Sequence, residues 1–328
     1  MKAAATAAPS PDQRAGDPEA ATERPILLHP GFAKTATTTL QEGLFDTHPE
    51  IGFLGRTRDG RPLDRLIHKI SREDSIAYDH QAVRAALALA IDDIPTHRRL
   101  ALSCENLSLY EVGDRGQVAA RLARLFPNAT ILFTIRNQNA LLRAWYFQKM
   151  KKYVKGGHWL GLEEYVRLKS KEPHRSIIGD LDYAPRIFHY MKLFGAGRVH
   201  VLPFEQLSLD RTGFARSLAS LLDLGSADIE ARLAEQPLNP RLGSGYIDFH
   251  RRYGRWLPGY LARKIGTRVA QRGWGTPLET ELPARVQRLV AANCAQGNAR
   301  LDAVFKLGLA ELGYPLPADG TERPAQAL

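Results

Sequence analysis

The sequence predicts an α/β protein in which a parallel β-sheet is flanked by helices, followed by a helical C-terminal part. Three observations support this prediction. Short apolar runs alternate with stretches at helical spacing, which is the pattern of βαβ units. The run at 129–135 is continuously apolar and rich in β-branched residues, as expected of a strand covered on both faces. From about Thr212 onward the pattern is helical almost throughout.

The individual elements follow from the same patterns. Strands are expected at 26–28, 49–54, 99–104, 129–135 and 198–202. Helices are expected just after Lys34 and over 81–94, 115–126, 139–153, 162–169 and 183–194. Residues 55–75 carry six basic side chains and are expected to form a polar connection, either a functional loop or a solvated excursion.

The chain length bounds the number of domains. With 328 residues, 44% of them hydrophobic, the chain can form one large domain or two small ones. We expect one domain over residues 24–315, with the Pro- and Gly-rich stretch 236–245 as the candidate break. Residues 1–23 lack the apolar core of a signal peptide and are predicted to be a disordered tail. Residues 316–328 are predicted to be a flexible C-terminal tail.

Charge and cysteine content narrow the class of partner. The 45 Lys and Arg residues against 35 Asp and Glu give a net charge of +10, which favours anionic partners. Cys104 and Cys294 make no disulfide framework, and two reduced cysteines suit the cytoplasm. No apolar run approaches the roughly 20 residues of a membrane span, so no transmembrane segment is expected.

The stretch from Ile26 to Leu40 is the clearest functional signal. A short apolar run ends at His29, Gly31 permits a tight turn, and Lys34 precedes a threonine-rich helix start. The free N–H groups of a first helical turn, the positive end of the helix dipole and a lysine together form a phosphate cradle. The alternative is that the threonines merely cap a helix.

This loop differs from the ordinary nucleoside-triphosphate loop, which needs a second Gly immediately before the Lys, where Ala33 stands here. It resembles the shortened 5′-phosphosulfate loop of bacterial sulfotransferases of the carbohydrate type, which often carry a His at the strand end, as His29 does here. The resemblance implies a P-loop-type fold and a donor site. The residues it places there are Gly31, Lys34, Thr35, Ala36, Thr37, Thr38 and Thr39. Ala36 departs from the family pattern, where Gly is usual.

Two further strands are expected to end in charged side chains, at Glu105 and Arg136. The carboxyl ends of parallel strands meet at one edge of a sheet, so both should lie near the Lys34 loop. This predicts an anion site with two cations and a carboxylate. The alternatives are that Arg136 only caps a strand end and that Glu105 pairs structurally with Arg99 or a helix cap.

The resemblance implies a role for each of these residues. Arg136 matches the family Arg that holds the 3′-phosphate of the donor, and Ala144 stands where a partner Ser is usual. Glu105 lies in Ser-Cys-Glu-Asn-Leu, close to the Ser-Ser-Glu-Asn-Leu of bacterial relatives, and is the expected general base. His29 is the alternative base. Lys34 would offset the charge that builds on the leaving group.

We therefore expect a sulfotransferase that moves a sulfonate from 3′-phosphoadenosine 5′-phosphosulfate (PAPS) to a hydroxyl acceptor. The expected acceptor is a carbohydrate or glycolipid, and a small alcohol or phenol is the second choice. No metal is expected, because no His/Cys cluster has ligand spacing. No nucleic acid partner is expected either, because the basic residues are spread along the chain. The sequence leaves the oligomeric state open. The alternatives are a small-molecule kinase and a non-catalytic nucleotide- or polyanion-binding protein. The basic, aromatic segment 148–159 could contact an acidic sugar or be a solvated face.

Overall fold

A computed structural model describes residues 18–55, 63–109, 114–153, 160–235 and 282–318, with nine isolated positions between 249 and 268. Its centre is a parallel sheet with the strand order β2-β3-β1-β4-β5. The strands are β1 (Ile26–His29), β2 (Ile51–Phe53), β3 (Arg99–Ser103), β4 (Thr130–Ile135) and β5 (Val199–Pro203). Leu28 of β1 pairs with Leu102 on one side and Ile131 on the other. The loop after β1 therefore emerges at the middle of the carboxyl edge, between the ends of β3 and β4.

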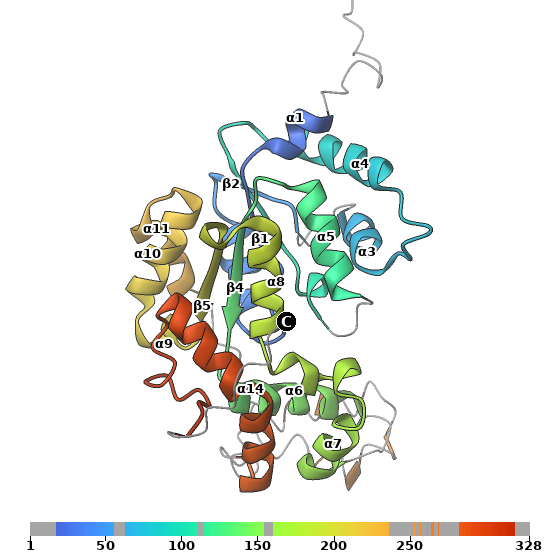
Figure 1. Cartoon of the computed structure of the whole chain (residues 1–328), viewed down its shortest axis with the longest axis vertical. Helices are drawn as coiled ribbons and strands as arrows, with labels where there is room; N and C mark the ends of the chain where they lie inside the picture. The colour runs from blue at the N-terminus through green and yellow to red at the C-terminus, as the bar shows by residue number, and fades with distance from the viewer. Residues whose placement is uncertain are drawn as a thin grey trace, which may run out of the picture.

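Helices cover both faces of the sheet and its carboxyl edge (Figure 1). They are α1 (Pro18–Glu23), α2 (Thr37–Leu40), α3 (Leu63–Arg72), α4 (His80–Asp92), α5 (Arg115–Leu125), α6 (Gln138–Tyr153), α7 (Leu162–Lys169), α8 (Ala184–Phe194), α9 (Gln206–Leu209), α10 (Arg211–Leu222), α11 (Ser226–Ala234) and α14 (Ala284–Phe305). A π-helical turn, η2 (Gln41–Phe45), extends α2. Short 3₁₀ turns are η3 (Glu105–Leu107), η5 (Pro173–Arg175), η6 (Ile177–Asp180) and η7 (Ala196–Arg198).

The sheet separates two hydrophobic clusters because successive strand residues face opposite sides. Leu28 belongs to the larger cluster, with α3, α4, α5 and α8, whereas its neighbour Leu27 belongs to the smaller one, with α10 and α11. Figure 1 shows α10 and α11 on one side of the sheet, and α6, α7 and α14 beyond the tip of β4. The predicted fold class, a parallel sheet flanked by helices, is confirmed.

Aspartates fix the starts of several helices. Asp79 accepts the backbone N–H of Ala82 at the start of α4, and Asp114 accepts those of Gly116 and Gln117 at the start of α5. Each such cap contributes about 1 kcal/mol.

Two segments differ from their predictions. The predicted polar connection 55–75 contains helix α3, whose buried Leu63, Ile67 and Ile70 are spaced as one helical face. The predicted tail 1–23 ends in helix α1, where Ala21 and Thr22 are buried. Residues 1–17 and 319–328, the candidate break 236–245 and positions 154–159 of the basic segment lie outside the described residues.

Cys104 and Cys294 are both free thiols, and Cys294 is buried in α14. Among the described residues, no helix combines the length and the apolar character that crossing a membrane requires.

Candidate functional site

The loop between β1 and α2 has a backbone suited to holding an anion. Gly31, Lys34 and Ala36 adopt left-handed conformations, with φ of 62°, 66° and 68°. Thr35, between the last two, does not. Alternation of left-handed and ordinary residues turns successive N–H groups into an anion-binding concavity. The φ of Gly31 favours glycine, and a Cβ there would also lie 3.1 Å from the Thr37 hydroxyl, which is a tight contact.

Three carbonyl groups of the loop accept hydrogen bonds from side chains. Arg136 Nη1 donates to the carbonyl of Lys34 at 3.1 Å, and the Ser108 hydroxyl donates to that of Gly31. Thr35 Oγ1 donates to the carbonyl of Phe32 at 2.7 Å. A carbonyl and the N–H of the next residue point in opposite directions across a trans peptide. The N–H groups that follow these three carbonyls therefore point away from their donors, where an anion can accept them.

Ala36 keeps a left-handed conformation without being glycine, which costs about 1 kcal/mol. We therefore expect Ala36→Gly to raise the free energy of unfolding by about 1 kcal/mol and the Tm by about 2 °C. Ala85→Gly, at an exposed position within helix α4, is the matched control and should lower stability by about 1 kcal/mol. Urea unfolding of the three proteins checks this, and a loss of stability in Ala36→Gly would contradict the observed loop conformation.

His29 is fully buried behind the loop. Its Nδ1 lies 2.8 Å from the Ser103 hydroxyl, and its Nε2 lies 3.0 Å from the Thr134 hydroxyl. Gln41 donates to the Ser103 hydroxyl in turn, at 3.1 Å. With both ring nitrogens engaged and no exposed surface, His29 is not placed to take a proton from an acceptor. These contacts favour a structural role for His29 over the expected role of alternative base.

The directions of these hydrogen bonds follow from the single proton of each hydroxyl. The proton of Thr35 goes to the Phe32 carbonyl, so Thr35 accepts from Thr134 at 2.9 Å. Thr134 must then accept from His29 Nε2, which therefore carries the ring proton, and Nδ1 accepts from Ser103. The neutral His29 thus connects β3 and β4 to the loop.

Burial lowers the pKa of His29 to about 3 from its usual 6.5. The unfolded chain binds a proton at this histidine below pH 6.5 while the folded protein does not, so stability is complete above pH 6.5 and falls toward pH 3. Between pH 6.5 and 5 this one group should cost about 2 kcal/mol of unfolding free energy.

Urea unfolding at pH 5.0, 6.5 and 7.5 checks this expectation, with His29→Gln showing a shallower loss toward low pH than the unaltered protein. The exposed His97, changed to Gln, serves as the control and should leave the steeper loss in place. Equal pH dependence in all three proteins would contradict a neutral, buried His29.

The threonines of the loop divide into two groups. Thr35 and Thr37 are buried, and both hydroxyls donate to the Phe32 carbonyl, at 2.7 and 3.3 Å. Thr38 is exposed and Thr39 is half-buried. The side chains of Thr35 and Thr37 thus stabilise the loop, so only their backbone N–H groups could donate to an anion.

Glu105 opens the 3₁₀ turn η3 directly after β3 and is half-buried, as is Lys34. The strand pairing sets its neighbourhood, because Ser103 pairs with His29 and the backbone N–H of Cys104 donates to the carbonyl of His29 at 3.1 Å. The carboxylate therefore follows β3 at the same sheet edge as the loop. Ser108, which holds the loop carbonyl of Gly31, belongs to the same turn region and was not predicted from the sequence.

Arg136 follows β4 and is half-buried. Its guanidinium lies 4.7 Å from the ring centre of Phe204, besides donating to the loop. Burial lowers the pKa of Arg136, and the Glu205 carboxylate opposes that shift most strongly. Ala144, the other expected donor residue, lies in the second turn of α6 and is partly accessible.

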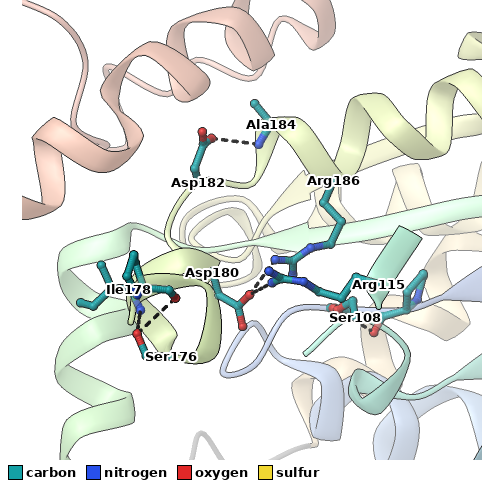
Figure 2. A network of polar contacts seen from close by, with 11 residues as sticks. Ser108, Arg115, Ser176, Ile178, Asp180, Asp182, Ala184 and Arg186 are labelled. Carbon is teal, nitrogen blue, oxygen red and sulfur yellow. Dashed lines mark hydrogen bonds and ion pairs between the residues drawn. The ribbon is translucent and has the colours of Figure 1, made fainter. Parts of the chain in front are cut away.

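An ion cluster behind the loop was not predicted. Arg115 and Arg186 both donate to the buried Asp180, the second at 2.6 Å, as Figure 2 shows. The Arg186 guanidinium also lies 4.6 Å from the ring centre of Phe32, and the rings of Phe32 and Tyr183 lie 4.5 Å apart between centres. The loop is thus supported by packing as well as by hydrogen bonds.

Comparison with solved structures finds a sulfotransferase from Alicyclobacillus acidocaldarius with a TM-score of 0.53 and 16% sequence identity, over 88% of this chain and 98% of that one. At this identity the likeness shows a shared fold. The sulfotransferase domain from the curacin biosynthetic pathway aligns over 90% of this chain and 99% of its own, with 14% identity and a TM-score of 0.39. No protein-family model and no curated protein matches the sequence.

Proposed function

We propose that the protein is a sulfotransferase of the bacterial, PAPS-dependent type. The observation that carries the proposal is the shortened loop. Its carbonyl groups at Gly31, Phe32 and Lys34 accept hydrogen bonds from side chains. In this proposal the backbone N–H groups of the loop, together with the Lys34 ammonium group, bind the sulfate end of a nucleotide donor. The shared fold with a sulfotransferase supports the proposal.

In this proposal each strand end has a part in the reaction. The loop N–H groups bind the 5′-phosphosulfate, and Lys34 offsets the negative charge that develops on the leaving phosphate oxygen. Arg136 donates to the Lys34 carbonyl through Nη1, and the remaining N–H groups of its guanidinium are proposed to bind the 3′-phosphate. Because Ala144 has no hydroxyl, Arg136 makes that contact without the serine that is usual in the family.

Glu105 is proposed to take the proton of the acceptor hydroxyl as its oxygen attacks sulfur. The S–O bond to the donor phosphate breaks as the new S–O bond forms, and adenosine 3′,5′-bisphosphate leaves. The net charge of +10 is compatible with an acidic carbohydrate or a glycolipid as acceptor. Two free cysteines support a reducing compartment such as the cytoplasm.

The test is to supply PAPS or Mg-ATP with a panel of oligosaccharides, glycolipids and phenols, and to measure which nucleotide product forms. Release of adenosine 3′,5′-bisphosphate that depends on an added acceptor supports the proposal. ADP release would instead make the protein a kinase, and turnover of neither nucleotide would leave a non-catalytic binding protein.

A further inference from the structure

Three consecutive residues after β4, at 136–138, each bind a different part of the chain. The first binds the phosphate loop, as described above. The second, Asn137, donates through Nδ2 to the carbonyl of Gly313 at 2.5 Å. The third, Gln138, exchanges hydrogen bonds with Asn298 of α14 at 2.7 and 3.1 Å, and both residues are buried. We call residues 307–315, which follow α14, the C-terminal segment. The residues after β4 therefore connect this segment to the loop between β1 and α2, which we call the donor loop.

Glu205, directly after β5, connects the same two parts. Its Oε1 accepts the backbone N–H of Asn137 at 3.0 Å, and its Oε2 accepts the hydroxyl of Tyr314 at 2.7 Å. Tyr314 is only 4% exposed. Burial, and then the Glu205 carboxylate, raise the pKa of Tyr314, so the phenol stays protonated and donates.

The Glu205 carboxylate interacts electrostatically with Arg136. Burial lowers the pKa of Arg136, and the negative charge of Glu205 opposes that shift. Yet the two side chains form no ion pair in the part of the chain that the structure describes. Both carboxylate oxygens are occupied by uncharged donors, Asn137 and Tyr314. Within the described residues, no carboxylate is therefore paired with the Arg136 guanidinium in competition with another anion.

We propose that Tyr314 is a positioning residue of the donor site, which holds the Glu205 carboxylate away from Arg136 and so makes the C-terminal segment a part of that site. This inference rests on the proposed function. Without the phenol, Glu205 Oε2 loses its partner and can turn toward Arg136, competing with the nucleotide phosphate. By reciprocity, a bound nucleotide should hold the C-terminal segment in place.

The experiment measures the affinity for adenosine 3′,5′-bisphosphate by calorimetry in four proteins. Tyr314→Phe should weaken binding about fivefold or more. Adding Glu205→Gln to that variant should restore affinity to within about twofold, because the amide keeps the Asn137 bond but carries no charge to compete. The control is Tyr146→Phe, which loses a comparable phenol bond, to the Leu160 carbonyl at 2.6 Å, and should bind as the unaltered protein does.

Hydrogen exchange gives a second readout. Bisphosphate should slow exchange over the C-terminal segment in the unaltered protein and less so in Tyr314→Phe. Unchanged affinity in Tyr314→Phe, or a double variant weaker than the single one, would overturn the inference while leaving the proposed function standing. No binding by the unaltered protein would overturn both.

Discussion

Replacing Glu105 with Gln is expected to lower kcat for sulfonate transfer about 100-fold or more, while the affinity for adenosine 3′,5′-bisphosphate stays within about twofold. The amide keeps the size of the side chain but cannot take the acceptor proton. Because Glu105 is proposed to act on the acceptor hydroxyl and not to bind the nucleotide, donor affinity should change little. Steady-state kinetics with the acceptor that turns over fastest, together with calorimetry, checks both parts.

The matched control is Glu235→Gln, which removes an exposed carboxylate after α11, on the other face of the sheet. Its kcat should equal that of the unaltered protein. If Glu105→Gln also kept full kcat, the base would have to be another group. The burial of His29 between Ser103 and Thr134 disfavours it as that group.

Replacing Lys34 with Ala is expected to lower kcat about 1,000-fold, because the ammonium group opposes the charge that develops on the leaving oxygen. It should also weaken binding of the bisphosphate, since a cation is lost from the phosphate site. Alanine already stands at the left-handed position two residues on, so Lys34→Ala should fold with a stability close to that of the unaltered protein.

Lys306→Ala is the control for this variant, because Lys306 is an exposed lysine with a φ of 54° at the end of α14. It removes the same charge from the same backbone conformation outside the donor loop, and its kcat should not change. Comparable losses in both variants would mean that overall charge, rather than the position of Lys34, drives the reaction.

The sheet and the loop could be predicted because their signals are local. The apolar run of β4 and the Gly31-to-Lys34 spacing lie within a few residues of sequence, and the structure places them as expected. Helix α3 was missed because its three buried apolar residues are interspersed with basic ones on the exposed face. The stripe is nevertheless strongly one-sided, so the spacing of Leu63, Ile67 and Ile70 is the signal that could have predicted this helix.

The parts of the site that sequence reasoning missed depend on partners far apart in the chain. His29 meets Ser103 and Thr134, 74 and 105 residues away, so its burial follows from the order of the strands and not from its neighbours in sequence. Glu205 and Tyr314 are 109 residues apart. The position of Glu205 at the end of a strand marks it as a candidate site residue. No sequence pattern near Glu205, however, predicts its hydrogen bond with Tyr314.

The central claim is that the loop around Lys34 binds the phosphates of a sulfonate donor rather than those of ATP. Calorimetric titration with adenosine 3′,5′-bisphosphate and with Mg-ATP, on the unaltered protein and on Lys34→Ala, tests it most directly. We expect the unaltered protein to bind the bisphosphate tightly, at least about tenfold more tightly than ATP, and Lys34→Ala to bind it more weakly. Preference for ATP, or no binding of either nucleotide, would contradict it.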